Sequence, residues 1–289
     1  MALLSIFDLP APAKLNLFLH VVGRRDDGYH LLQSVFALID WCDTLHIERR
    51  TDGRLARHDL GPALPADDLC LRAARALQQA SGCGLGADIS IDKRVPTGAG
   101  LGGGSSDAAT VLIALNRLWQ LRWPRERLAT LALTLGADVP FFVGGCNAWV
   151  EGIGEQLTPI ELPPARYAVL KPADSIPTAA IFDSPLLVKN TPRATVAVFR
   201  VSAKSSGNGG LSGFGRNDLQ VPAMAHSAQV GQALELLRGR FGNSRMSGSG
   251  SAVFAEIGVG DASEQAPEGW TYRLSRGLER HPLADWLDH

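Results

Sequence analysis

The stretch PTGAGLGGGSSDAA, residues 96–109, decides how the rest of this chain is interpreted. It holds five glycines and two serines and has very little side-chain bulk. Such a stretch suits a flexible linker, a dinucleotide-binding turn or a cradle for phosphate, because each needs a backbone free of large side chains. The neighbouring sequence separates these three interpretations.

A linker is excluded by the strong periodicity on both sides of the stretch. The alternating segment ADISIDK (87–93) predicts a strand before it, and AATVLIALNRLW (108–119) predicts a helix after it. We expect that helix to begin at Ser105 or Ser106, either of which can cap it. Asp107 would then fall in the first turn, where a negative charge suits the helix dipole.

A dinucleotide site also fits poorly. Gly98, Gly100 and Gly103 match the pattern GxGxxG, but any glycine-rich stretch does so. The dinucleotide fold needs an acidic residue about 20 positions further on, and none occurs between Asp107 and Glu126. No Gly-Lys-Ser/Thr follows the glycines, so a P-loop is excluded. The remaining interpretation is a phosphate cradle made of backbone N–H groups and a helix N-terminus.

The segment AKLNLFLHVVG (13–23) alternates strictly and predicts a half-buried strand. Lys14 and Asn16 lie on its second face, which is either solvated or lines a cleft. Residues 31–50 continue as apolar strand segments around Asp40 and Asp43.

Asp138 is the candidate base for a phosphoryl-transfer reaction. It lies in GADVPFF (136–142), which we expect to be extended because Pro140 disfavours helical geometry at the preceding residue. On local sequence alone, Asp138 suits a turn or cap equally well. Pairing with Lys14 would favour the catalytic interpretation, since a lone buried charge is costly.

Periodicity and end signals predict the other elements in outline. They are a helix from Asp68, its cap, to about Ala80, a helix at 124–136, a strand at 167–171, a short helix at 178–182, a helix at 223–241, a loop at 202–216, and a second Gly/Ser loop in 245–257 that leads into a strand.

Bulk properties indicate a soluble cytoplasmic protein. The chain has 289 residues, 45% of them hydrophobic, and a formal net charge of -1, which speaks against binding to nucleic acid or to a membrane surface. We find no signal peptide and no apolar run that would span a bilayer. The four cysteines form no CxxC pair, so we expect buried reduced thiols rather than a metal site.

Four motifs together resemble the GHMP kinases. They are PAKLNLFLHVVGRRDDGYH (12–30), PTGAGLGGGSSDAA (96–109), LGADVPFFV (135–143) and SGSGSAVFA (247–255). The resemblance runs over nearly the whole chain and implies an α/β fold, of the α+β type, with two domains at 1–160 and 161–289 and the active site in the cleft between them. AKLNLFL with DGYH and LGADVPFF is most similar to the members that phosphorylate a cytidine diphosphate-linked alcohol in the non-mevalonate isoprenoid pathway.

The resemblance also implies roles for individual residues. Asp138 would take the proton from the acceptor 2-hydroxyl, and Lys14 would stabilise the transferred phosphoryl group. ATP phosphates would lie against Pro96, Thr97, Gly98, Ala99, Gly100, Leu101, Gly102, Gly103, Gly104, Ser105 and Ser106, with Lys93 near the nucleotide. The cytidine diphosphate substrate would be held by Asn16, Tyr29, His30, Thr178 and Phe182, its cytosine lying between Tyr29 and Phe182.

The remaining expectations are less specific. The cofactors implied are ATP and Mg²⁺, the latter without an identified protein ligand, and the oligomeric state expected is a monomer or weak homodimer. Asp68 stands where GHMP kinases of this kind usually carry Asn, which puts an adenosine contact there in doubt. The alternatives are another GHMP kinase, of the homoserine or mevalonate type, and a nucleotide-binding protein without catalysis.

Overall fold

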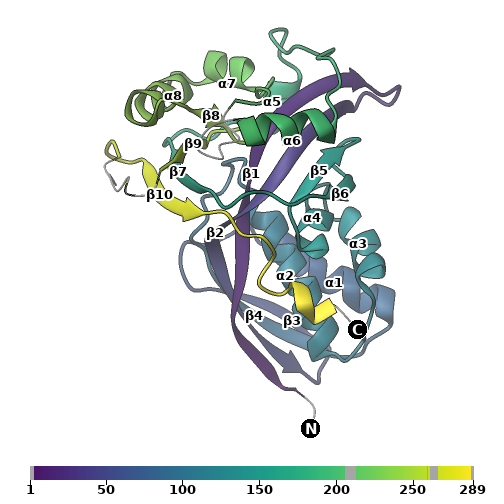
Figure 1. Cartoon of the computed structure of the whole chain (residues 1–289). Helices are drawn as coiled ribbons and strands as arrows, with labels where there is room; N and C mark the ends of the chain where they lie inside the picture. The colour runs from purple at the N-terminus through teal and green to yellow at the C-terminus, as the bar shows by residue number, and fades with distance from the viewer. Residues whose placement is uncertain (1–2, 206–212, 259, 261–265, 288–289) are drawn as a thin grey trace.

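The chain forms a mixed α/β fold built on two sheets (Figure 1). The computed structural model describes residues 3–205, 213–258, 260 and 266–287. The fold class predicted from the sequence is confirmed. The first sheet ends at Pro159 and the second begins at Arg166. The division into domains at residue 160 stays a prediction.

The first sheet has the strand order β3-β4-β2-β5-β6, with β1 paired to β2. Its strands are β1 (Ser5–Arg24), β2 (His30–Arg50), β3 (Leu55–Asp59), β4 (Gly86–Asp92), β5 (Ala148–Glu151) and β6 (Gln156–Pro159). The second sheet is antiparallel, in the order β10-β7-β9-β8. Its strands are β7 (Arg166–Lys171), β8 (Arg245–Met246), β9 (Val253–Ile257) and β10 (Thr271–Arg276).

Most helices gather in two groups, one beside each sheet (Figure 1). Beside the first sheet lie α1 (Leu69–Ser81), α2 (Gly103–Leu118), α3 (Arg125–Leu133) and α4 (Val139–Gly144). Beside the second lie α5 (Thr178–Phe182), α7 (Gln220–His226) and α8 (Ala228–Phe241). Helix α6 (Val196–Ser205) packs through Phe199 on Phe18 of β1 and Trp149 of β5, and the 3₁₀-helix η1 (Ala284–Leu287) contacts α2.

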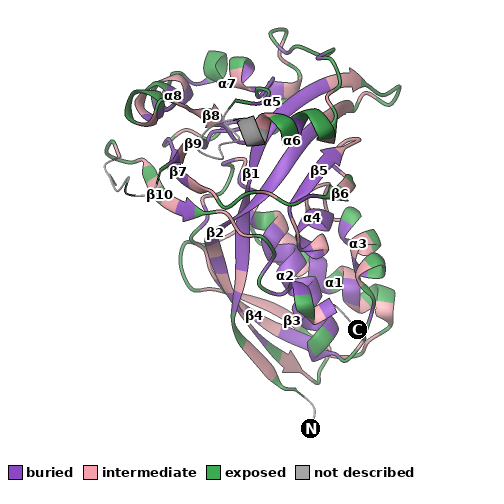
Figure 2. Ribbon diagram, viewed as in Figure 1, coloured by how far each residue is buried: buried purple, intermediate pink, exposed green. Residues whose placement is uncertain are grey.

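The long hairpin of β1 and β2 connects the two groups. Residues 11–21 of β1 are all buried, so the half-buried strand predicted there is wrong (Figure 2). Loops that lie far away in the sequence pair with the edge of β1 that does not face β2. Leu19 N donates to Arg216 O at 2.9 Å and Lys14 N donates to Leu101 O at 2.9 Å. Backbone groups that would otherwise face water are thereby paired.

The helix signals of α1 are confirmed. The Asp68 side chain accepts a hydrogen bond from Leu71 N, and Gly82 ends the helix in the left-handed conformation with φ of 67°. Both features are local, since a cap needs only residues within one turn. The strand at β7 and the short helix at α5 are likewise confirmed.

Two predictions around the active-site motifs are wrong. The segment predicted as extended after Asp138 is helix α4, because Pro140 lies in the first turn, where a missing N–H costs nothing. Helix α2 begins at Gly103 with Gly102 as its N-cap and no side-chain cap, so neither Ser105 nor Ser106 caps it. Its first turn holds no acidic residue, which corrects the position expected for Asp107.

Two further predictions in the second half are revised. The single helix predicted at 223–241 is broken at Ser227, whose backbone is extended and whose hydroxyl donates to Asp174 Oδ2 at 2.6 Å. The loop predicted at 202–216 is wrong where α6 continues to Ser205. Residues 206–212 of that segment lie outside the described residues.

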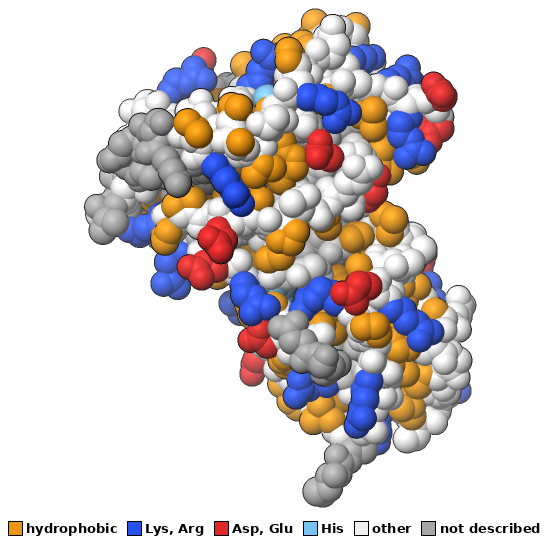
Figure 3. Space-filling model, turned by 45° about the vertical axis from the view of Figure 1, so that its right-hand side comes forward, with side chains coloured by type: hydrophobic (Ala, Val, Ile, Leu, Met, Phe, Trp, Pro, Cys, Tyr) orange, Lys and Arg blue, Asp and Glu red, His pale blue; other side chains and the backbone are white. Residues whose placement is uncertain are grey.

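The surface and the cysteines have few special features. Acidic and basic side chains are interspersed over the face seen in Figure 3, in line with the net charge of -1. No helix among the described residues has the length and apolar character needed to cross a membrane. The four cysteines are free thiols, and only Cys70 is fully buried, so the prediction of four buried thiols holds for one.

Candidate active site

The glycine loop, residues 96–104, forms the wall between two neighbouring cavities. Gly98, Gly100 and Gly102 line both. Each of the two cavities is named after the element beside it, β1 or α1. The β1-side cavity holds about 900 Å³ of empty space and is lined by Lys14, Asn16, Asp138, Thr178 and Phe182 among others. The α1-side cavity holds about 840 Å³ and is lined by Leu64, Pro65, Asp68, Leu69, Lys93 and the loop itself.

The glycines are required by close approach of another backbone. Gly100 has φ of +73°, and a Cβ there would lie 2.2 Å from the Ser247 carbonyl oxygen. The loop is held by the second Gly/Ser loop, since Ser247 Oγ donates to Gly100 O at 3.0 Å and Ala252 N donates to Ala99 O at 3.1 Å. Side chains at Gly100 are therefore excluded by packing as well as by backbone conformation.

Lys14, Asn16 and Asp138 meet in the β1-side cavity, although Asp138 lies far from the other two in sequence. Lys14 Nζ lies 3.5 Å from Asp138 Oδ2 and donates to Asn16 Oδ1 at 2.6 Å and to Gly100 O at 3.2 Å. Asn16 Nδ2 in turn donates to Ser34 Oγ at 2.9 Å. The ammonium group is thus fixed beside both the carboxylate and the glycine loop.

Asp138 occupies the N-cap position of α4 without acting as a cap. Its side chain makes no capping hydrogen bond and remains 33% exposed, with Lys14 as its ion-pair partner. A purely structural aspartate at this position would satisfy the helix N–H groups. The side chain is instead directed to Lys14 and remains accessible from the cavity.

Burial decides the electrostatics of Lys14. Its side chain is only 4% exposed, and burial lowers the pKa of its ammonium group, an effect that the Asp138 carboxylate partly offsets. The ring of Phe36 lies 4.6 Å from Nζ and contributes a favourable cation–π contact. Asp138 compensates the charge of this ammonium group only in part, so the group attracts an anion that enters the cavity.

A bulge in β1 places the lining residues. The register with β2 shifts between Asn16 and Leu19, so Lys14, Asn16 and then Leu19 line the cavity, while Phe18 turns into the core. Strict alternation would have left Leu19 on the opposite face.

The remaining residues expected to hold substrate are only partly brought together. The His30 and Phe182 rings stack at 5.2 Å with an interplanar angle of 22°, and Thr178 Oγ1 and Ser249 Oγ are hydrogen-bonded at 2.8 Å. Phe182 and Thr178 line the β1-side cavity. Tyr29 and His30, in contrast, lie outside the lining of that cavity, and Tyr29 is 60% exposed.

Lys93 lines the α1-side cavity, but carboxylates surround its ammonium group. Nζ donates to Asp107 Oδ2 at 2.6 Å and makes a close contact with Asp43 Oδ2. Burial alone would lower the pKa of Lys93, yet Asp107 and Asp43 outweigh it and raise that pKa. Asp43 also accepts from Arg94 N and Val95 N, at 2.6 and 2.7 Å. These contacts join both ends of the glycine loop.

Asp43 was noticed in the sequence only as a polar interruption of an apolar strand. A fully buried aspartate in such a strand needs a cationic or N–H partner. An aspartate within an apolar strand was therefore the sequence feature that could have indicated its role. Arg57 contacts the carboxylates of Asp59 and Asp68 near the α1-side cavity. No pattern in the sequence pointed to it.

The two serines of the loop differ in accessibility. Ser105 lines the α1-side cavity, whereas Ser106 is fully buried and its Oγ has no hydrogen-bond partner among the described residues. No group of three or more His, Cys, Asp or Glu suited to a metal ion occurs in the part of the chain that the structure describes. Ser105 and Asp138 offer oxygen donors on either side of the glycine loop. They line different cavities, so the described residues do not form a shared ligand set; Mg²⁺ commonly takes few protein oxygens together with phosphates and water.

Comparison with known proteins identifies the class. The family model for the GHMP kinases N terminal domain matches residues 68–146, which contain the glycine loop and Asp138. A crystal structure of mevalonate kinase, 13% identical, superimposes with a TM-score of 0.68 over 95% of this chain and 99% of its own, which shows a shared fold. The fold and the glycine loop are those of a GHMP-type kinase.

Nearer relatives define the family. The 4-diphosphocytidyl-2-C-methyl-D-erythritol kinase of Methylibium petroleiphilum is 68% identical over 99% of both chains. A crystal structure of 4-(cytidine 5'-diphospho)-2C-methyl-D-erythritol kinase, 33% identical, superimposes with a TM-score of 0.78 over 94% of this chain and 98% of its own. This chain belongs to the 4-diphosphocytidyl-2-C-methyl-D-erythritol kinase family.

Proposed function

We propose that this protein transfers the γ-phosphate of ATP to the 2-hydroxyl of 4-diphosphocytidyl-2-C-methyl-D-erythritol. The observation that carries the proposal is the Lys14–Asp138 pair, in a cavity that shares the glycine loop with a second cavity. ATP would occupy the α1-side cavity and the acceptor the β1-side cavity. The transferred phosphoryl group would cross at Gly98, Gly100 and Gly102.

The phosphates would lie against the glycine loop. Backbone N–H groups of the loop and the N-terminus of α2 at Gly103 favour negative charge there. Lys14, held beside Gly100 O, would stabilise the charge that develops on the transferred group. These groups are fixed by neighbouring backbone, so little reorganisation is needed during the reaction.

Asp138 would accept the proton from the acceptor hydroxyl. It is accessible from the β1-side cavity, makes no capping hydrogen bond and lies 3.5 Å from the ammonium group of Lys14. Phosphoryl transfer needs little covalent chemistry from the protein, so positioning and charge stabilisation carry the catalysis.

The β1-side cavity suits a nucleotide-linked alcohol. Phe182 and the apolar walls around it would hold the cytosine ring, His30 beside Phe182 would hydrogen-bond the base edge, and Asn16 and Thr178 would contact the rest of the substrate. Stacking of a base on a ring contributes about 1–3 kcal/mol. The role of Tyr29 on the other face of the cytosine requires its exposed ring to turn toward the cavity.

Mg²⁺ bound to the phosphates of ATP would neutralise part of their charge. Ser105, which lines the α1-side cavity, would be the protein oxygen beside it, with phosphates and water as the other ligands. Lys93, tied to Asp43 and Asp107, would contribute to the nucleotide cavity through its position in the wall.

The test is a phosphoryl-transfer assay with purified protein, ATP and Mg²⁺. The cytidine diphosphate substrate should be phosphorylated, whereas homoserine and mevalonate in the same panel should not. Turnover of one of those two instead would assign another kinase of the class. ATP binding without turnover of any acceptor would indicate a nucleotide-binding protein without catalysis. Sedimentation of the same sample tests the expected monomer or weak homodimer.

A further inference from the structure

The segment 60–68 connects β3 to α1 and forms the outer wall of the α1-side cavity. Leu64, Pro65 and Asp68 of this segment, and Leu69 just after it, line the cavity opposite the glycine loop. Residues 60–68 have no helix or strand, and most of them are exposed. Such a segment has no ladder of backbone hydrogen bonds, so its shape depends on the side chains that hold it.

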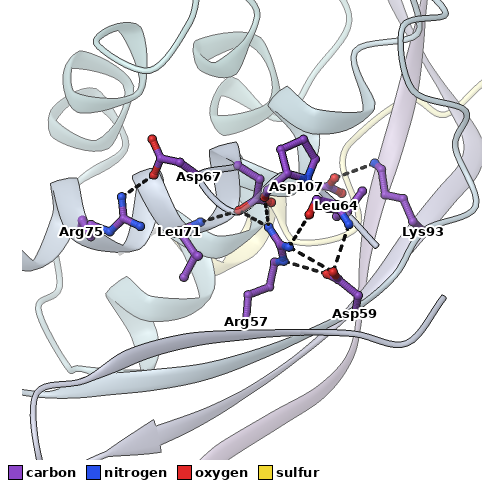
Figure 4. A network of polar contacts seen from close by, with 10 residues as sticks. Arg57, Asp59, Leu64, Asp67, Leu71, Arg75, Lys93 and Asp107 are labelled. Carbon is purple, nitrogen blue, oxygen red and sulfur yellow. Dashed lines mark hydrogen bonds and ion pairs between the residues drawn. The ribbon is translucent and has the colours of Figure 1, made fainter. Parts of the chain in front are cut away.

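Arg57 lies in strand β3, just before this segment, and its side chain holds the segment in place. Its guanidinium donates to both carboxylate oxygens of Asp59, at 2.7 and 3.0 Å, and to Pro65 O at 2.8 Å and Leu64 O at 3.1 Å. It also lies 2.9 Å from Asp68 Oδ1. Figure 4 shows Arg57 at the centre of these contacts.

Two partners of Arg57, Asp59 and Asp68, also hydrogen-bond to backbone N–H groups, one within the segment and one just after it. Asp59 Oδ2 accepts from Leu64 N at 3.0 Å, and Asp68 Oδ1 accepts from Leu71 N at 3.1 Å at the start of α1. The Arg57 side chain is only 7% exposed. A planar guanidinium can serve two carboxylates and two carbonyls at once, and an ammonium cannot reproduce that geometry.

The wall that Arg57 holds lies across the α1-side cavity from the glycine loop. The glycine loop supplies the phosphate side of the cavity, and the opposite side presents the apolar residues Leu64, Pro65 and Leu69. Apolar side chains suit the faces of a base and sugar better than they suit phosphate.

We propose that Arg57 is a positioning residue for ATP, which orders the segment 60–68 as the nucleoside-binding wall of the α1-side cavity. This rests on the proposed function, because it takes the α1-side cavity as the ATP site. Without Arg57 the segment is no longer held in one conformation. The entropy lost when ATP orders it then weakens the affinity for ATP.

The test compares Arg57→Met with Arg75→Met in the full chain. Arg75 pairs with Asp67 of the same segment at 2.5 Å, but from an exposed position, and is the matched control. Calorimetric titration with ATP alone should show about tenfold or weaker affinity in Arg57→Met and nearly unchanged affinity in Arg75→Met. The KM for ATP should rise by the same factor, with the KM for the acceptor unchanged.

Inorganic tripolyphosphate separates positioning from general damage. It fills only the phosphate side, so its affinity should be equal in Arg57→Met and the parent protein. Equal ATP affinity in the two proteins would overturn the proposal, and so would a parallel loss of tripolyphosphate binding. If Arg57→Met does not fold, Arg57→Lys replaces it, and unchanged ATP affinity there also overturns the proposal.

The same titration distinguishes this proposal from the proposed function. A parent protein that binds ATP more tightly than Arg57→Met but phosphorylates no acceptor contradicts the catalytic proposal only. A parent protein that does not bind ATP overturns the role of Arg57.

Discussion

Two lysines whose side chains are almost wholly shielded from solvent lie beside the glycine loop, and their surroundings are opposite. Lys93 contacts two buried carboxylates, those of Asp43 and Asp107, and its pKa is raised despite burial. Lys14 contacts neutral oxygens and only one carboxylate, that of Asp138 at 3.5 Å, and burial lowers its pKa.

The difference separates a lysine that holds the loop from one that faces a ligand. The charge of Lys93 is compensated within the protein, and its contacts join the strand before the loop to the helix after it. The charge of Lys14 is only partly compensated, so an incoming phosphate gains from it. A buried ion pair with all its partners contributes geometry, whereas a partly paired charge remains available for chemistry.

The largest expected effect comes from Asp138→Asn. The amide cannot accept the proton, so kcat should fall by about 10²–10⁴-fold while ATP affinity stays close to that of the parent protein. Steady-state kinetics and calorimetry check this. Near-normal turnover would remove Asp138 from the role of base.

Lys14→Met should be nearly as severe for catalysis. Loss of a preorganised charge at the transferred group should reduce kcat by about 10²–10³-fold. Single-turnover rates at saturating ATP measure the chemical step. If kcat is unchanged and only the KM for the acceptor rises, Lys14 binds substrate without stabilising the transition state.

Lys93→Met should damage stability more than Lys14→Met does. It leaves two buried carboxylates without their common cation, which should cost about 3–5 kcal/mol in the free energy of unfolding. Denaturant unfolding of both variants checks the contrast. Equal losses in the two variants would mean that the surroundings of the two lysines do not differ in energy as they do in geometry.

The smallest expected effect is a pH dependence from Lys14. The charged form is required, so kcat should be constant below the pKa of Lys14 and fall as pH rises through it, at a value below that of an ordinary lysine. A pH–rate profile shows this limb. Lys14→Arg, which stays charged, should lose the limb, and a limb unchanged in that variant would assign it to another group.

Much of the candidate site was predictable from local sequence, while its catalytic role stays a proposal. The glycine loop, Lys14 and Asp138 were all singled out because their residue types are unusual for their positions. Whether Asp138 caps a helix or pairs with Lys14 was not predictable, since both suit the same short motif. Contact with Lys14 across the fold is what separates the two.

The errors arose where local rules compete with long-range contacts. Pro140 suits an extended segment as well as the first turn of α4, and Gly102 replaced the serines as the start of α2 because of its left-handed backbone. Asp43 and Arg57 act only through partners that the fold brings to them.

Local sequence alone predicted the strands, the capped helix α1 and the bare backbone of residues 96–104. Each depends mainly on interactions between residues that are close in sequence. The two cavities on either side of that loop, the bulge that turns Leu19 into one of them, and the opposite pKa shifts of Lys14 and Lys93 depended on the folded chain. Burial and pairing are properties of neighbours in space, and the neighbours that matter here come from distant parts of the sequence.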